Sequence, residues 1–382
     1  MKNIALLIET SNAYARGLLR GVVAYMREHP TWSIHLAEHG RGDRPPHWLA
    51  DWHGDGILAR VETPSMARAL RRVTMPVVDL SAARLIPSLP WFETDDAAIA
   101  QLAYEHLKEC GFKRFAYCGD PRFNWSNWRS EHFQRAVRAD GAPCFVFEAS
   151  KKAPTDDAGL VDDLVRWLRR LQKPIGVMAC YDLRGQQILD ACRRARIPVP
   201  EQVAVIGVDN DEIVCELSHP PLTSIVPNTR RTGYEAAALL DILMAGHKAR
   251  GLTHLIPPSG VAARQSTDVL AVEDAHVAQA VRFIREHACQ GINVSDVLKV
   301  VPQGRRLLES RFKRFLGRTP HDEIMRVQIN RVKELLSETD LPLAEVAERT
   351  GFKHVEYLSV VFKKKAGMPP SGYRALHRKA HR

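Results

Sequence analysis

A pattern of four residue types occurs twice near the C-terminus, at an offset of about 50 positions. The two copies carry the same residues at the same spacings: Leu308, Phe312, Gly317 and Pro320, then Leu358, Phe362, Gly367 and Pro370. Each copy contains a short amphipathic stretch, a tight break and a longer basic stretch that stops at glycine, which commonly ends helices. A unit repeated in this way is one supersecondary motif used twice. The layout predicts a helix-turn-helix in each copy.

The longer helix of each copy is expected to have an apolar face and a polar face. Leu308 and Phe312 in the first, and Leu358 and Phe362 in the second, lie on one face and are predicted core residues. If the two helices are held about 34 Å apart, they can enter successive major grooves of DNA, where arginine reads guanine and lysine mainly anchors phosphate. The candidate DNA contacts are Arg305, Arg306, Glu309, Ser310, Lys313, His354, Glu356, Tyr357, Ser359, Lys363 and Lys364.

The formal charge of the chain is concentrated in the same region. Of 54 Lys and Arg and 44 Asp and Glu in the 382 residues, 21 and 11 lie from His276 onward, which leaves 33 of each sign before it. The net charge of +10 therefore belongs to the last quarter of the chain. A neutral body with a basic terminal domain favours a polyanion partner, most commonly nucleic acid, although merely solvated lysine faces give the same count.

About 100 C-terminal residues resemble the DNA-binding domain of the AraC family. The resemblance is carried by RRLLESRFKRFLGRTPHDEI, RVKELL and LAEVAERTGFKHVEYLSVVFKKKAGMPPSGYR. It implies double-stranded operator DNA as a partner. The chain departs from the family at Gly304, where a serine often caps the first recognition helix. In the second recognition helix His354, Glu356 and Ser359 take the exposed positions, so fewer base contacts are expected there.

The first 260 residues or so alternate short apolar runs with amphipathic stretches. The apolar runs are IALLIE, WSIHLAE, DGILARV, PVVDLS, FAYCGD, CFVFEAS, IGVMACYD and VAVIGVDN. Strands that alternate with helices predict an α/β fold with doubly wound parallel sheets, and eight strands suit two linked lobes better than one. Ligands bind such folds at the carboxyl ends of strands, where polar residues stand here: Glu9, Ser11, Asp182, Asp209 and Asn210. No glycine-rich phosphate-binding run follows a strand, which disfavours a nucleotide site.

The same region resembles the periplasmic-binding-protein-like sensor of the LacI family. The matching residues are TDDAAIAQLAYEHLKECGFKRFAYCGD, VAVIGVDNDE, LTSIVPNTRRTGYEAAALL and the Trp125-x-x-x-Arg129 run. Such a sensor ahead of an AraC-type domain is the arrangement of the bacterial xylose regulators. The resemblance implies that Arg129, Asp182 and Asp209 hold sugar hydroxyls through charge-assisted bonds. It also implies that Trp125 or Trp128 covers the apolar face of a pyranose ring.

Most of these residues also have a structural interpretation. Arg129 and Asp209 could form an ion pair, and Asp182 could cap the following helix. Trp125 and Trp128 could be core or lobe-interface residues. Asn210 could simply make a turn after its strand.

The identity of the effector stays open at this stage. Tyr14 is a further candidate for the pocket wall. The sequence departs from the xylose regulators at Glu9, which replaces a neutral amide, and at Ala15-Arg16, where they carry an acidic residue before the arginine. Xylose, another pentose, another sugar or a sugar derivative therefore all remain candidates.

The chain is expected to comprise a ligand-sensing domain over 1–267, a short stiff linker over 268–275 and a DNA-binding domain over 276–382. The linker has too little Gly, Ser or Pro for a long flexible tether. Seven scattered cysteines without a C-x-x-C pair indicate reduced thiols and no metal site. The chain shows no signal peptide and no apolar run of about 20 residues, so a cytoplasmic protein outside the membrane is expected.

These observations predict a sequence-specific DNA-binding transcription regulator controlled by a small ligand, with a monosaccharide as effector and no cofactor. Paired half-sites favour a homodimer. By analogy with the family, we expect activation of sugar-utilisation genes, with RNA polymerase as a further partner. A repressor would contain the same sensor and DNA-binding domains. The alternatives are a repressor that responds to a non-sugar ligand, a constitutive DNA-binding protein whose α/β domain only dimerises, a sugar-processing enzyme and a transport solute-binding protein.

Overall fold

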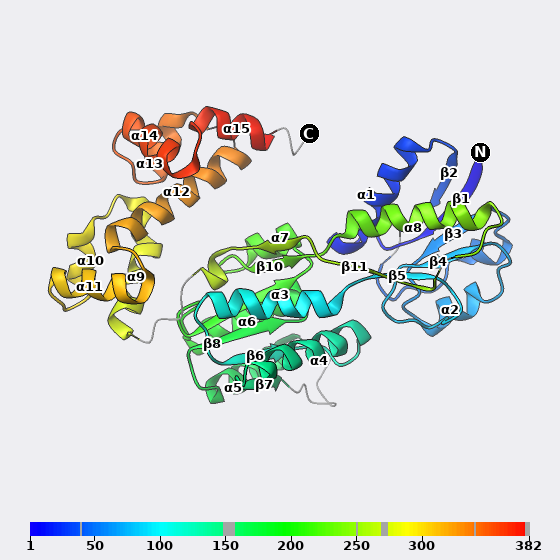
Figure 1. Cartoon of the computed structure of the whole chain (residues 1–382), viewed down its shortest axis with the longest axis horizontal. Coiled ribbons are helices and arrows are strands. Elements are labelled where there is room, and N and C mark those ends of the chain that lie inside the picture. The colour runs from blue at the N-terminus through cyan, green and yellow to red at the C-terminus, as the bar shows by residue number, and fades with distance from the viewer. Residues whose placement is uncertain (39, 148–156, 250, 269–273, 340, 379–382) are drawn as a thin grey trace. The chain divides into compact units, whose positions relative to one another are not determined.

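The computed structural model of the chain describes all residues except 39, 148–156, 250, 269–273, 340 and 379–382 (Figure 1). It divides into an N-terminal unit, Met1–Ala271, and a C-terminal unit, Val272–Arg382. Most of the linker expected at 268–275 lies outside the described residues.

The first lobe of the N-terminal unit is built on a six-stranded sheet in the order β11-β5-β4-β3-β1-β2, and all its strand pairs are parallel. Its elements are β1 (Lys2–Leu7), α1 (Ala13–Glu28), β2 (Trp32–Leu36), η1 (His47–Asp51), β3 (Gly56–Ala59), α2 (Pro64–Leu70), β4 (Val77–Asp79), β5 (Trp91–Thr94), α8 (Thr229–Met244) and β11 (Thr253–Ile256). Strands β3, β4 and β5 are buried at every position because helices cover both faces of the sheet.

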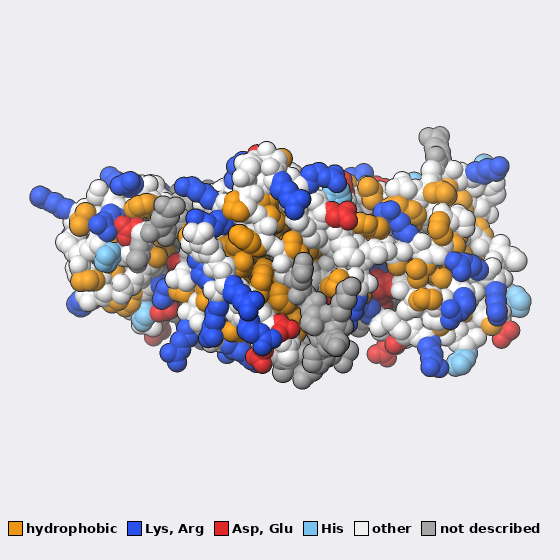
Figure 2. Space-filling view, turned by 90° about the horizontal axis from the view of Figure 1, so that it is seen from below, with side chains coloured by type: hydrophobic (Ala, Val, Ile, Leu, Met, Phe, Trp, Pro, Cys, Tyr) orange, Lys and Arg blue, Asp and Glu red, His pale blue; other side chains and the backbone are white. Residues whose placement is uncertain are grey.

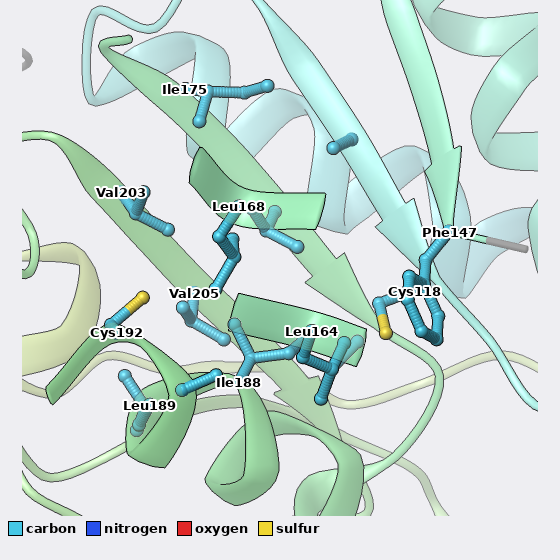
Figure 3. Packing of buried hydrophobic residues seen from close by; sticks show 14 of the residues in the cluster. Cys118, Phe147, Leu164, Leu168, Ile175, Ile188, Leu189, Cys192, Val203 and Val205 are labelled. Carbon is cyan, nitrogen blue, oxygen red and sulfur yellow. The ribbon is translucent and has the colours of Figure 1, made fainter. Parts of the chain in front are cut away.

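The second lobe has its own six-stranded sheet in the order β12-β10-β9-β8-β6-β7, in which only the pair β10 and β12 is antiparallel. Its elements are α3 (Asp96–Glu109), β6 (Phe115–Cys118), α4 (Asn124–Ala139), β7 (Cys144–Phe147), α5 (Asp157–Arg170), β8 (Ile175–Ala179), α6 (Asp182–Ala195), β9 (Val203–Val208), α7 (Glu212–Leu217), β10 (Thr223–Val226), β12 (Gly260–Ala262) and η2 (Gln265–Thr267). Figure 3 shows the core between this sheet and helices α5 and α6, where Leu168, Ile188 and Val205 are fully buried.

The eight strands predicted from apolar runs are all present, and the chain passes between the lobes three times. It leaves the first lobe after β5, returns to it after β10 through α8, and crosses again between β11 and β12. The polar residues that follow strands in both sheets are therefore brought to the cleft between the lobes.

Helices α1 and α8 of the first lobe approach each other at glycines. A Cβ placed on Gly21 would lie 2.1 Å from the carbonyl oxygen of Arg230, and one on Gly233 would lie 2.0 Å from that of Leu18. Neither obstacle is a flexible side chain, so the two helix backbones would have to separate to admit a methyl group.

Replacing Gly21 by alanine is therefore expected to lower the free energy of unfolding of the N-terminal unit by about 1–3 kcal/mol. Urea denaturation followed by tryptophan fluorescence measures this change. The matched control is Arg20→Ala on the exposed side of α1, for which a change within about 0.5 kcal/mol is expected. An unchanged urea midpoint for Gly21→Ala would contradict the close approach of the helices.

The C-terminal unit is all-helical and contains the two predicted helix-turn-helix units (Figure 1). Its elements are α9 (Ala275–His287), η3 (Ala288–Gln290), α10 (Val294–Val300), α11 (Arg305–Leu316), α12 (Pro320–Glu338), α13 (Leu343–Arg349), α14 (Val355–Ala366) and α15 (Pro370–Arg378). Helices α10 and α11 form the first unit, α13 and α14 form the second, and the long helix α12 connects them.

The internal repeat of the sequence corresponds to a repeat in the structure. The glycines that end α11 and α14, Gly317 and Gly367, have φ values of 68° and 76°, in the left-handed region that favours glycine. The predicted core residues Leu308 and Phe312, and their counterparts Leu358 and Phe362, are all fully buried.

Candidate ligand pocket and DNA-binding helices

A cavity of about 120 Å³, the inner cavity, lies in the cleft between the two lobes. Its wall comes from residues that follow strands in both sheets and from helix α4: Asn12, Ala13, Tyr14, Arg41, Arg60, Leu80, Ala82, Glu93, Thr94, Trp125, Arg129, Tyr181, Asp182, Leu183, Asp209, Asp211 and Val214. This position, at the carboxyl ends of parallel strands, is where doubly wound folds bind ligands. The volume admits several water molecules or one small polar ligand.

Five of the nine ligand-binding residues predicted from the sequence line the inner cavity: Tyr14, Trp125, Arg129, Asp182 and Asp209. The other four do not. Glu9 is buried behind the wall, with its carboxylate 3.2 Å from the Nε of Arg60, and Ser11 is exposed. The Trp128 ring lies under the guanidinium of Arg84, and Asn210 has a left-handed backbone conformation with a φ of 48°.

Arg129 is held rigidly beneath the cavity. It is 5% exposed, and its Nε donates to Asp96 Oδ1 at 2.6 Å while Nη1 donates to the carbonyl of Cys180 at 2.7 Å. The ion-pair partner is therefore Asp96 and not Asp209, the partner considered from the sequence. The ring of Trp125 lies 4.9 Å from the same guanidinium, which fixes the orientation of both side chains.

Asp182 and Asp209 form the acidic side of the inner cavity. Asp182 accepts hydrogen bonds from Ser224 Oγ at 2.6 Å and from the backbone N–H of Asp211 at 2.7 Å, and it does not cap helix α6, whose N-cap is Tyr181. Burial and the neighbouring Asp209 charge raise the pKa of Asp182, and burial raises that of Asp209. A raised pKa favours the protonated form of a carboxyl group, which can donate as well as accept, so this side of the cavity can pair with either end of a ligand hydroxyl.

The backbone at Asp209 is strained. Its φ of 108° lies in the region that favours glycine, and Asn210 follows with a further positive φ. Consecutive residues of this kind cost free energy and cluster at ligand sites, where the surrounding structure holds them in place.

The sequence reasoning missed an arginine and a glutamate in the wall, Arg60 and Glu93. Arg60 is 8% exposed, lies between the carboxylates of Glu9 and Glu62, and stacks its guanidinium 5.1 Å from the Tyr14 ring centre. The Tyr14 hydroxyl in turn lies 3.1 Å from Thr94 Oγ1. Arg60 directly follows β3, so the strand-end rule that flagged Asp182 could have flagged it. Glu93 lies within β5, which no apolar run indicated, so that rule could not have found it.

Glu93 has an unsatisfied acceptor in the cavity wall. It is 5% exposed, and its Oε2 accepts from Arg84 at 3.3 Å. Its Oε1 is buried and has no hydrogen-bond partner among the described residues. Burial and the nearby Asp96 charge raise the pKa of Glu93. A buried oxygen in this state needs a hydrogen-bond partner, which a ligand hydroxyl can supply.

Nothing in the described part of the chain forms a cluster of three or more His, Cys, Asp or Glu side chains suited to a metal ion. The described residues also include no helix that is both long and apolar enough to span a bilayer.

Most of the predicted DNA-contacting side chains are on the surfaces of α11 and α14. Nine of the eleven are exposed, and Glu309 and Ser359 are half-buried. Glu309 pairs with Arg305 at 3.0 Å, and Ser359 Oγ donates to the Val355 carbonyl at 2.9 Å, so that hydroxyl is used within its own helix. As expected from Gly304, helix α11 begins without a side-chain cap.

Two exposed apolar residues of the recognition helices were not anticipated. Leu307 on α11 is 48% exposed and Val360 on α14 is 67% exposed. In the space-filling view Lys and Arg side chains are prominent on the visible surface, with Asp and Glu less so (Figure 2). The surfaces of α11 and α14 thus combine basic, polar and apolar groups, the mixture that reads base edges and phosphates.

Three family models match the chain in consecutive segments. A XylR N-terminal domain matches residues 3–97, a periplasmic binding protein-like domain matches 104–267 and a helix-turn-helix domain matches 299–376. The xylose operon regulatory protein of Escherichia coli strain K12 is 34% identical over 98% of this chain and 97% of its own length. The chain belongs to the family of xylose operon regulatory proteins. The member from Haemophilus influenzae is 32% identical over 97% of both chains.

A solved structure of this family has the same fold. It is described as the xylose-binding transcription activator xylR, and it matches with a TM-score of 0.82 and 33% identity over 98% of both chains. The two α/β lobes followed by two helix-turn-helix units are thus the architecture of the xylose operon regulatory proteins, as the sequence predicted. Members of the family are transcription regulators.

Proposed function

We propose that this protein regulates transcription by binding operator DNA with an affinity that is set by a sugar bound between the lobes of its N-terminal unit. The observation that carries the proposal is the inner cavity, whose wall joins carboxylates and arginines from both lobes, in a chain that also holds two helix-turn-helix units. A ligand that contacts both lobes at once stabilises one relative arrangement of them, and that arrangement is the signal passed to the DNA-binding helices.

The charges around the inner cavity favour a neutral polyol over an anion. Its three arginines already face carboxylates, because Arg41 pairs with Glu62, Arg60 with Glu9 and Arg129 with Asp96. Those three carboxylates lie outside the wall, whose own carboxyl groups are Glu93, Asp182, Asp209 and Asp211. The hydroxyls of a neutral sugar can both donate to and accept from such carboxyl groups. A carboxylate or phosphate would need cationic partners, and each arginine of the wall already pairs with a carboxylate.

The finer features of the function belong to the same proposal. The protein acts as a homodimer on paired half-sites in the cytoplasm, associated with the nucleoid when bound to DNA. It activates sugar-utilisation genes through RNA polymerase and is not an enzyme, because the carboxyl groups of the cavity serve to bind hydroxyls. The residues proposed to hold the sugar are Tyr14, Arg60, Glu93, Trp125, Arg129, Asp182 and Asp209.

Differential scanning fluorimetry against pentoses, hexoses, uronic acids and sugar phosphates tests the proposal. At least one neutral sugar is expected to raise the melting temperature, because binding to the folded state alone stabilises it. The acidic sugars are expected to have no effect at the same concentration. If no sugar in the panel shifts the melting temperature, the sugar assignment is wrong and a constitutive DNA-binding protein becomes the better account.

Burial raises the pKa of Glu93 to about 8, so its carboxylate form prevails only at higher pH. Replacing Glu93 by glutamine is expected to weaken binding of the active sugar about tenfold at pH 9, since a neutral amide accepts a weaker hydrogen bond than a carboxylate. Isothermal titration calorimetry of wild type and variant measures the loss. The control is Glu131→Gln on the exposed side of α4, which should leave the affinity unchanged. Equal affinities for wild type and Glu93→Gln would remove Glu93 from the site.

A further inference from the structure

A second cavity, the outer cavity, adjoins the inner cavity in the same cleft. It has a volume of about 450 Å³, compared with about 120 Å³ for the inner cavity. Both cavities have Arg41 and Trp125 in their walls, so these two side chains form the boundary between them.

The outer cavity is also enclosed by both lobes. The first lobe contributes Arg41, Gly42, Glu62, Thr63, Pro64, Ala83 and Leu85, and the second contributes Arg122, Phe123, Asn124 and Trp125. Asn124 Nδ2 reaches the carbonyl of Ala83 at 3.4 Å, which links the two lobes at this point. A group bound here would therefore bridge the same two bodies as a group bound in the inner cavity.

The wall of the outer cavity has the chemistry of a sugar-binding surface. The rings of Phe123 and Trp125 are stacked, with centroids 5.1 Å apart and planes inclined by 14°. The Arg41 guanidinium lies 4.8 Å from the Phe123 ring centre and 5.7 Å from that of Trp125. Arg122 also lies 5.6 Å from the Phe123 ring centre, so the two ring faces already contact each other and guanidinium groups. The half-buried rings line the cavity together with hydroxyl, amide and guanidinium groups, a mixture that offers a sugar ring both apolar contact and hydrogen bonds.

The boundary residue Arg41 is well placed to contact the link between two sugar rings. Its side chain is 36% exposed and its Nε donates to Glu62 at 3.1 Å, so it is partly tethered and partly in contact with solvent. The buried arginines of the inner cavity, Arg60 and Arg129, have side chains that are each about 6% exposed and held in place by ion pairs. Among these three arginines, the one between the cavities is thus the one that retains freedom to adjust around a longer ligand.

We propose that the outer cavity is a second sugar subsite, and that the effector is a disaccharide or a longer saccharide whose first ring occupies the inner cavity. The inference rests on the proposed function and extends it from one ring to two. The inner cavity, at about 120 Å³, is smaller than the roughly 300–1,000 Å³ typical of small-molecule sites, whereas the outer cavity, at about 450 Å³, lies within that range.

The test compares each monosaccharide with its own dimer by isothermal titration calorimetry on the full chain: xylose with xylobiose, and glucose with cellobiose and maltose. At least one disaccharide is expected to bind about tenfold or more tightly than its monosaccharide. Ala83→Trp, which fills the outer cavity, should remove this advantage and leave monosaccharide affinity unchanged. Phe123→Ala, which takes away an aromatic surface without filling the cavity, should reduce it severalfold.

The outcomes separate this inference from the proposed function. If a monosaccharide binds at least as tightly as every disaccharide tested, the second subsite is refuted while the sugar-responsive function stands. If a disaccharide binds more tightly but Ala83→Trp and Phe123→Ala both leave its advantage intact, its second ring lies elsewhere and the inference is again wrong. If neither monosaccharides nor disaccharides bind, the proposed function fails first.

Discussion

Replacing Glu323 by alanine is expected to destabilise the C-terminal unit by about 3 kcal/mol. Glu323 is fully buried in helix α12, and its carboxylate pairs with Arg318 at 2.5 Å and with Arg326 at 2.7 Å. Alanine would leave two like charges facing each other across the space of the lost carboxylate. The side chains of both arginines are about a quarter exposed. The expected loss of stability is therefore at the lower end of the range for removing one partner of a buried ion pair.

The loss can be assigned to the correct unit spectroscopically. All seven tryptophans of the chain lie before residue 168, in the N-terminal unit, whereas both units contribute helix. Glu323→Ala should shift the urea transition followed by circular dichroism at 222 nm and leave the tryptophan fluorescence transition unchanged. The exposed pair of Glu345 and Arg349 provides the control, because Glu345→Gln should cost less than about 0.5 kcal/mol. Unchanged transitions for Glu323→Ala would show that the carboxylate is not holding α12 in place.

The same residue predicts a dependence on pH. Burial alone would raise the pKa of Glu323, but the hydrogen bond and charge of Arg326, with the charge of Arg318, hold it below its ordinary value. A carboxyl group whose pKa is lowered by folding stabilises the folded state fully above its unfolded pKa of about 4.3 and loses that contribution as the pH falls. The wild-type transition should therefore move to lower urea between about pH 5 and pH 3 more steeply than that of Glu323→Gln.

Replacing Asp209 by glycine is expected to abolish the sugar response, with an affinity loss of about a hundredfold or more, while the protein stays folded. The variant removes a carboxylate that lines the inner cavity. It also places glycine at a φ of 108°, which relieves backbone strain in the folded state. This gain offsets the loss of stability that comes from the greater conformational entropy of glycine in the unfolded chain. The melting temperature without sugar should stay within a few degrees of the wild-type value.

Asn210→Gly is the matched control for this prediction. Asn210 is the next residue, also has a positive φ of 48°, and is absent from the wall of the inner cavity. The control should therefore have a similar effect on backbone strain and keep the sugar-induced rise in melting temperature. If Asp209→Gly retained the sugar response, or if Asn210→Gly lost it as completely, the assignment of Asp209 as a sugar ligand would be wrong.

The sequence predicted the fold well because its signals are local and repeated. The 50-residue repeat requires two copies of one helical motif, and apolar runs such as those over β8 and β9 are long enough to be recognised as buried strands. Strand β5 was not predicted, because two of its four residues, Glu93 and Thr94, are polar and interrupt any apolar run. The resemblance to a periplasmic-binding-protein-like sensor and to the AraC DNA-binding domain predicted how the elements are arranged.

The candidate site was predicted less completely because the sequence does not show which side chains contact each other in the folded protein. Arg129 pairs with Asp96, 33 residues away, and nothing in the sequence prefers that carboxylate to Asp209. Trp125 and Trp128 stand three positions apart on α4, yet only Trp125 lines the inner cavity, and Trp128 packs on Arg84. Which residues of α4 face the cleft depends on how the whole second lobe packs, and the local sequence does not show this.

The central claim is that sugar binding changes affinity for DNA, and fluorescence anisotropy tests it most directly. A labelled duplex selected from a random library by the full chain is titrated with protein, with and without the sugar that raises the melting temperature. The account predicts a change in Kd of about fivefold or more for wild type, and none for Asp209→Gly. A sugar that binds tightly to the wild-type protein and leaves its Kd for DNA unchanged would contradict the account.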